Sequence, residues 1–220
     1  MGVPLSDLRS AAYCPRQLYY KRSEADRAPP PEVPPIRDLA FRYGDLLRAS
    51  DETLAELPIA LDPQEYRRAL ERTRETIDRW DDLVHPTERD VLVDGKDCRG
   101  RVHKVLSDPV APSIVSAGKP PEQGVWKPQS VHAVGAAKTL AWRHQTRVRS
   151  AYVEYPAWGV IRRIELSGRR NAAYRRTLRS VRDLEGPPPR VRDRSKCDPC
   201  AYSSQCGVKT RTLRSLLGRG

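Results

Sequence analysis

The stretch RDVLVDGKDCRGRVHKVLSDPVAPSIVS, residues 89–116, is where the pattern of the chain changes from helical spacing to short runs typical of strands. The short runs Arg89–Asp94 and Arg101–Leu106 are typical of strands. Gly95 lies between them and indicates a turn, and Ser113–Ser116 is a third short strand. We therefore expect the central part of the chain to form strands of one sheet.

Helical patterns lie on both sides of this stretch. The clearest is Pro63–Trp80, where apolar residues recur every three or four positions. The other expected helices are Pro4–Ala12 with Ser6 as N-cap, Ile36–Ala49, Gln129–His144 and Asn171–Leu184. Two more strands, Ser150–Tyr155 and Val160–Leu166, are expected to form a hairpin around Trp158-Gly159. Strands interleaved with helices in this order predict an α/β fold with a mixed sheet.

Proline divides the chain into segments. PPPEVPP, residues 29–35, is expected to be a stiff connector outside any helix or central strand. A glycine and three prolines, residues 186–189, end the last helix. The expected organisation is a mainly helical N-terminal segment (1–88), an α/β core (89–186) and a C-terminal cysteine segment (187–220).

The charge of the chain favours a polyanionic partner. Among its 220 residues, 40 Lys and Arg stand against 28 Asp and Glu, for a net charge of +12. Most of the basic residues are Arg, whose guanidinium binds phosphate in a bidentate manner. We therefore expect a nucleic acid as partner. No apolar run is long enough to span a membrane and the first residues lack a signal-peptide pattern, so we expect a cytoplasmic protein without a membrane partner.

Three of the five cysteines form the motif KCDPCAYSSQC, residues 196–206. Cys197, Cys200 and Cys206 leave a four-coordinate zinc site or an iron–sulfur cluster one ligand short, and Cys14 is the best candidate for the fourth ligand. Three interpretations remain open: an iron–sulfur cluster, a zinc site, and buried thiols without metal. Cys98 lies apart from this pattern and is expected to be an ordinary buried thiol.

The stretches LRSAAYCPRQLYY (residues 8–20) and CDPCAYSSQC (residues 197–206) resemble those of the CRISPR-associated iron–sulfur exonucleases, the fourth Cas family, which are related to the RecB nuclease domain. The resemblance implies a restriction-endonuclease-like (PD-(D/E)xK) core. It also implies a [4Fe–4S] cluster held by four cysteines, with zinc as the alternative cofactor. Its implied partners are DNA, single-stranded or as strand ends, and the Cas integrase proteins of spacer acquisition in antiviral defence. The four cysteines are Cys14, Cys197, Cys200 and Cys206.

The same resemblance implies a catalytic site for Mg²⁺ or Mn²⁺, but its residue types are not retained. The family has a His, an Asp, a Glu-x-Lys pair and a Gln at these positions. Here the corresponding residues are Arg48, His103, Ile114, Ser116 and His132. Neither Ile114 nor Ser116 supplies the carboxylate or ammonium that the chemistry needs. A rebuilt site would have to use the two histidines with Asp94, Asp97 or Glu122.

Two functions follow as alternatives. The first is a DNA-binding protein with lost or weakened nuclease activity, and the second is an active metal-dependent exonuclease on single-stranded DNA with rearranged ligands. The expected DNA contacts are Arg16, Lys21, Arg22, Arg169, Arg170, Arg175, Arg176, Arg179, Arg182, Lys209, Arg211 and Arg214. Tyr19, Tyr20 and Tyr202 are expected to pack around the cysteines rather than to stack on bases.

Overall fold

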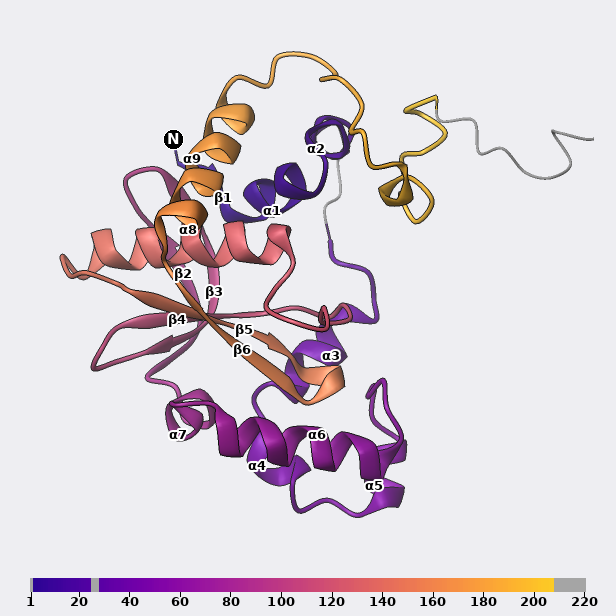
Figure 1. The fold of residues 1–220 in the computed structure, drawn as a ribbon, viewed down its shortest axis with the longest axis vertical. Helices are drawn as coiled ribbons and strands as arrows, with labels where there is room; N and C mark the ends of the chain where they lie inside the picture. Colours follow the sequence, from indigo (N-terminus) through magenta and orange to yellow (C-terminus); the bar gives the residue numbers. More distant parts are fainter. Residues whose placement is uncertain (1, 25–27, 208–220) are drawn as a thin grey trace, which may run out of the picture.

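The computed structural model describes residues 2–24 and 28–207. Its centre is a six-stranded mixed sheet in the order β1-β3-β4-β5-β6, with β2 also paired to β3 (Figure 1). The strands are β1 (Val3–Pro4), β2 (Glu88–Asp94), β3 (Cys98–Leu106), β4 (Ala111–Val115), β5 (Ser150–Tyr155) and β6 (Val160–Glu165). The pairs β1/β3 and β4/β5 are parallel, and the others are antiparallel. The prediction of an α/β fold with a mixed sheet is confirmed.

Helices cover both faces of the sheet (Figure 1). One face carries α1 (Leu5–Tyr13), α8 (Lys127–Arg143) and α9 (Gly168–Arg182). The other carries α3 (Val33–Leu39), α4 (Tyr43–Leu46), α5 (Asp51–Ala55), α6 (Pro63–Thr76) and α7 (Trp80–Val84). The remaining helices are α2 (Pro15–Arg22) and the short η1 (Pro156–Trp158) and η2 (Arg194–Lys196). Among the described residues, no helix combines the length and the apolar character that a membrane span requires.

The helix α1 packs closely on α8. A Cβ atom added to Gly135 of α8 would lie 2.9 Å from side-chain carbons of both Leu5 and Leu8, so a larger residue would force these leucines to shift. Leu5 and Leu8 are both fully buried, which removes their apolar surface from water. The N-terminal helix is therefore part of the core of the sheet.

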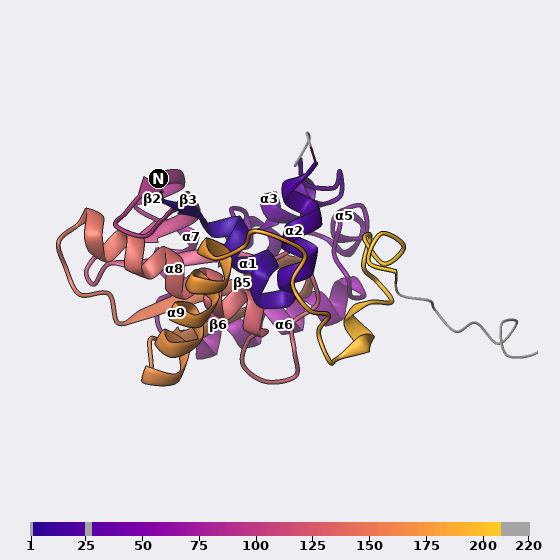
Figure 2. The ribbon, with the colours of Figure 1, turned by 90° about the horizontal axis from the view of Figure 1, so that it is seen from above.

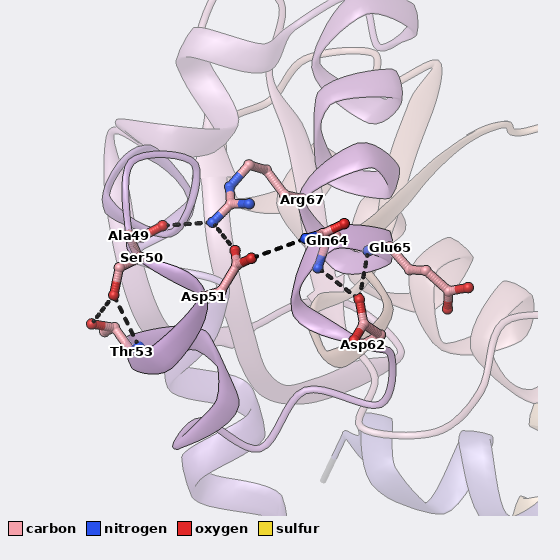
Figure 3. A network of polar contacts seen from close by, with 8 residues as sticks. All are labelled: Ala49, Ser50, Asp51, Thr53, Asp62, Gln64, Glu65 and Arg67. Atoms are coloured by element: carbon pink, nitrogen blue, oxygen red, sulfur yellow. Dashed lines mark hydrogen bonds and ion pairs between the residues drawn. The ribbon is translucent and has the colours of Figure 1, made fainter.

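On the other face, the helices α5 and α6 are each capped by a side chain, and Arg67 joins them (Figure 3). Ser50 Oγ accepts a hydrogen bond from the Thr53 N–H at the start of α5. Asp62 accepts from the first N–H groups of α6, which would otherwise lack a partner. Arg67 of α6 then contacts both the Asp51 carboxylate and the Ala49 carbonyl, each at 2.7 Å. These contacts fix α5 against α6.

Most predicted elements are confirmed, but several boundaries are wrong. Ser6 is not the N-cap of α1: Pro4 has that position and no side chain caps it. The PPPEVPP stretch is not wholly outside helices, because α3 begins at Val33 with prolines in its first turn. Proline is tolerated there since the first N–H groups of a helix have no partner within it. The helix expected at Pro63–Trp80 ends at Thr76, and Trp80 begins α7.

The helix expected at Ile36–Ala49 is divided into α3 and α4, and a buried lysine explains where α3 ends. Lys104 of β3 donates to the carbonyl of Ala40, the C-cap of α3, at 2.6 Å. It also donates to the Leu83 carbonyl in the last turn of α7 at 2.7 Å. Its third hydrogen bond goes to the Glu154 carboxylate of β5 at 2.8 Å. All three N–H donors of the ammonium are therefore satisfied.

The Lys104–Glu154 ion pair lies entirely within the protein. Both side chains are 0% exposed, and Ser113 Oγ donates to the other Glu154 oxygen at 2.5 Å. Burial lowers the pKa of Lys104, while the Glu154 carboxylate raises it. A buried charge that loses its partner is far more costly than an exposed one.

We expect Lys104→Met to lower the free energy of unfolding by about 3–5 kcal/mol, because it leaves the buried Glu154 side chain without its ion-pair partner. The double variant Lys104→Met with Glu154→Leu should lose less than the sum of the two single variants. Arg48→Ala is the control, since it breaks the exposed Arg48–Asp45 pair and should cost less than about 1 kcal/mol. Urea unfolding of the four variants and the wild type measures these free energies. A loss below about 1 kcal/mol for Lys104→Met would show that the Lys104–Glu154 pair is not a buried ion pair.

Candidate functional site

One edge of β3 has a gap in its strand pairing. On one side β2 pairs with β3 from Arg99 to Val105. On the opposite side β1 pairs only at Cys98 and Arg99, and β4 only at residues 104–106. Within the described chain, residues 100–103 thus have no strand partner on that edge. A cavity of about 580 Å³ opens at this gap, and we call it the basic groove.

Basic side chains from four elements line the basic groove. They are Arg9 of α1, Lys21 of α2, Arg37 of α3, and Arg99 and Arg101 of β3. None of the described residues that line it is Asp or Glu. Asp90, which does not line the groove, contacts two of these arginines. Its carboxylate lies 4.0 Å from Arg37 and 3.8 Å from Arg101. A concave site lined by charge of one sign concentrates ligands of the opposite sign.

The floor of the basic groove contains the two predicted histidines. His103 Nδ1 accepts a hydrogen bond from the Val115 N–H at 3.1 Å, in place of a β3–β4 ladder bond. Because Nδ1 is the acceptor, the proton of the neutral ring is on Nε2, which is then a donor. Beside it, Gln129 Nε2 donates to Ser116 Oγ at 3.2 Å.

Several polar atoms of the described residues that line the groove are buried without a hydrogen-bond partner. His132 is only 7% exposed, and neither of its ring nitrogens has a hydrogen-bond partner among the described residues. Gln129 Oε1 and Arg37 Nε, from residues lining the same cavity, are also buried without a partner. Buried polar groups are nearly always hydrogen-bonded, so several exceptions around one cavity need an explanation.

Both histidines are uncharged at neutral pH. Burial lowers the pKa of His103 to about 3, and the nearby charges of Arg37, Arg9 and Arg101 add to this effect. Burial also lowers the pKa of His132 well below its ordinary value, with Arg9 and His103 as further causes. The floor therefore offers N–H donors that carry no positive charge of their own.

The resemblance stated above pairs five positions with catalytic residues, and the structure brings three of them together. His103, Ser116 and His132 line the basic groove. Ile114 is 1% exposed and belongs to the apolar core under α1 and α8. Arg48 is exposed and pairs with Asp45 at 2.9 Å.

The carboxylates that could have completed a rebuilt metal site do not line the groove. Asp94, Asp97 and Glu122 are all absent from its described lining, and Asp97 pairs with Arg182 at 2.7 Å instead. The sequence-based prediction missed Arg9, Arg37, Arg99, Arg101 and Gln129 at this site. The spacing of Arg99 and Arg101 was an available signal, because residues two apart on a strand point to the same side.

The expected DNA contacts divide into three groups. Arg16, Arg22 and Arg182 make internal contacts, with the Pro188 carbonyl, Asp7 and Asp97 respectively. Lys21 lines the basic groove, and most of the remaining arginines of α9 are exposed. Lys209, Arg211 and Arg214 lie outside the described residues.

The four cysteines of the motifs line a second, small cavity. Cys14 lies between α1 and α2, and the C-terminal segment brings Cys197, Cys200 and Cys206 to the same cavity. Figure 2 shows this segment beside α2, although the two are far apart in the sequence. None of these cysteines is in a disulfide. The two ends of the described chain thus meet at one set of thiols.

Contacts around the thiols hold the two segments together. The Tyr13 hydroxyl donates to the Lys196 carbonyl at 3.0 Å, and the Tyr20 hydroxyl donates to the Gln205 carbonyl at 3.2 Å. The rings of Tyr20 and Tyr202 stack with centroids 6.1 Å apart. Tyr20 and Tyr202 therefore line the same cavity as the cysteines, as expected from the sequence, whereas Tyr19 is not part of its described lining.

The donor set is suited to a soft metal centre. Gln17 Nε2 lies 3.9 Å from Cys200 Sγ, within hydrogen-bonding distance of the sulfur. Burial raises the pKa of Tyr13, and the neighbouring Cys200, Cys14 and Cys197 raise it further. In residues 2–24 and 28–207, no three His, Cys, Asp or Glu side chains are close enough together to hold a single metal ion. Four thiols around one cavity, with an N–H donor beside a sulfur, fit the ligands of an iron–sulfur cluster in kind and number.

Cys98 is separate from this site. It is 1% exposed and lies under α9, where its sulfur is 3.3 Å from the Tyr174 hydroxyl. Burial raises the pKa of its thiol, which makes the reactive thiolate scarce. The prediction of an ordinary buried thiol is confirmed.

Comparison with known proteins adds little. No family model matches the chain, and no curated protein matches it. Among solved structures, the chain is similar to the crystal structure of SSO0001, with a TM-score of 0.46 and 11% sequence identity. That similarity covers 95% of this chain and 87% of the other.

The buried, uncharged His132 predicts a pH-dependent stability. In the unfolded chain its ring takes up a proton below about pH 6.5, whereas in the folded chain it stays neutral, so acid favours unfolding. Between pH 7 and pH 5 the wild type should lose more of its free energy of unfolding than His132→Asn loses, with about 2 kcal/mol as the upper limit of the difference. Urea unfolding at both pH values measures the difference, with the exposed His144→Asn as the control. Equal pH dependence in the wild type and His132→Asn would show that this histidine takes up a proton as readily in the folded chain as in the unfolded chain.

Proposed function

We propose that this chain binds single-stranded DNA or DNA strand ends in the basic groove. The observation that carries the proposal is the lining of the groove: five basic side chains, with no Asp or Glu among its described residues. Phosphates neutralised by Lys and Arg release condensed counterions, which supplies much of the affinity for nucleic acid. A DNA strand can lie along the open edge of β3, beside the sheet.

The bound DNA is held rather than cut. Metal-dependent nucleases place Mg²⁺ or Mn²⁺ on carboxylate oxygens, and the described residues of the groove supply none. His103 Nε2 carries a proton and so has no free lone pair for a metal ion. An active exonuclease with rearranged ligands is the competing function, and the cleavage assay below separates the two.

The cysteine motifs suggest the biological setting. Their resemblance to those of the CRISPR-associated exonucleases supports a restriction-endonuclease-like core and a role in spacer acquisition or DNA-end handling, beside the Cas integrase. On this proposal the four cysteines hold a [4Fe–4S] cluster. Bound there, the cluster would cross-link the two ends of the chain and supply folding free energy, as structural metal sites do.

The cluster proposal predicts brown protein after anaerobic purification, with about four irons per chain. Cys14→Ala should lose iron and also lower the free energy of unfolding, because it releases the α1–α2 hairpin from the C-terminal segment. Cys98→Ala is the matched control, since it changes a buried thiol outside the site, and it should keep its iron. Colourless protein with one zinc per chain would contradict the cluster, and full iron occupancy in Cys14→Ala would contradict its ligand set.

DNA binding is tested with a labelled single-stranded oligonucleotide and fluorescence anisotropy in EDTA. For about four phosphate contacts the affinity should fall about 50-fold between 50 and 200 mM salt. The double variant Arg99→Gln with Arg101→Gln should bind more weakly and with a shallower salt dependence. Arg68→Gln with Arg72→Gln on α6 removes the same charge from exposed positions outside the groove and is the control.

The same oligonucleotide incubated with Mn²⁺ should keep its full length. Shortening that His103→Gln abolishes would overturn the proposed loss of activity and favour the exonuclease. Equal binding by the groove variant and its α6 control would instead show that the DNA lies elsewhere on the protein.

A further inference from the structure

The unpartnered atoms at the floor of the basic groove indicate that a ligand group belongs there. His132 has one N–H donor in its neutral form, and the fold gives that donor no acceptor. His103 Nε2 is a second donor, because its Nδ1 is already an acceptor for the Val115 N–H. Two uncharged donors beside the guanidinium of Arg9 suit a ligand rich in acceptor oxygens and carrying negative charge.

The position of this floor at the start of α8 also favours a negatively charged ligand. Gln129 and His132 lie in the first two turns of α8, a helix of 17 residues. The N-terminal end of such a helix carries partial positive charge and favours anions. The helix end alone would not define a site, but here it coincides with the buried, unpartnered imidazole.

We propose that this floor binds the terminal phosphate of a nucleic-acid strand without a metal ion. His132 and His103 donate to its oxygens and Arg9 offsets its charge; a bridging water satisfies the acceptor atoms of Gln129 and His132. The inference rests on the proposed DNA binding and specifies which part of the strand enters the groove.

A terminal phosphate fits this place better than an internal one. His132 is nine-tenths buried, so the group that reaches it must enter end-on. An internal phosphate has a nucleoside on each side, whereas a terminal phosphate has only one. It also carries about −1.5 to −2 charge at pH 7, which the basic lining of the groove favours.

The test compares oligonucleotides of one sequence that end in a 5′-phosphate, a 3′-phosphate or only hydroxyl groups. Anisotropy is measured in EDTA for the wild type, His132→Asn and Lys138→Gln, which changes an exposed cation two turns further along α8. One of the two phosphorylated strands should bind about tenfold more tightly than the hydroxyl strand, as expected for charge-assisted hydrogen bonds. His132→Asn should remove this preference and Lys138→Gln should keep it. If His132→Asn does not fold, Arg9→Gln, at an exposed position, replaces it.

Each other outcome overturns the inference in a distinguishable way. Equal binding of all three strands rejects the terminal-phosphate site but leaves DNA binding in place. A preference that appears only when Mn²⁺ replaces EDTA shows a metal site instead. A preference that His132→Asn leaves unchanged places the phosphate elsewhere, and no binding of any strand overturns the proposed function together with this inference.

Discussion

The ammonium of Lys104 connects the two halves of this structure. Its three hydrogen bonds end α3 at Ala40, hold the last turn of α7 at Leu83, and reach across the sheet to Glu154 of β5. A buried lysine is tolerated only when every donor has a partner and an opposite charge is present. Those partners come from three separate parts of the chain, so this one side chain joins α3 and α7 to two strands of the sheet.

Lys104 is next to His103, and the two side chains serve opposite purposes. Lys104 lies among the helices α3–α7, fully satisfied and inaccessible. His103 lies at the point where β4 has separated from β3, and it takes the N–H of Val115 that a continuous ladder would have used. The gap left in the sheet forms the basic groove, and arginines from α1, α3 and β3 converge on it. The hydrogen bonds of Lys104 thus hold β3 in place on one face, and His103 of the same strand lies at the groove.

The sequence predicts the elements well and the sites only in part. The strand-like run Arg89–Asp94 and the spacing of the cysteines are local patterns, and the structure has a strand at the first and one cavity lined by the cysteines. The Lys104–Glu154 pair is invisible in sequence, because a Lys in a strand normally faces solvent and its partner is 50 residues away. The basic groove was missed for a similar reason: Arg9 and Arg37 meet Arg101 only through the topology of the sheet. Local propensity cannot indicate which distant cations will share a cavity.

The central claim is that a DNA strand lies along the open edge of β3. Hydrogen–deuterium exchange with and without a single-stranded oligonucleotide tests it residue by residue, since amide exchange reports which backbone groups become protected. The account predicts slower exchange at residues 100–103 and in the first turns of α8, with no change in α6. Protection confined to α9, or none in the basic groove, would contradict it.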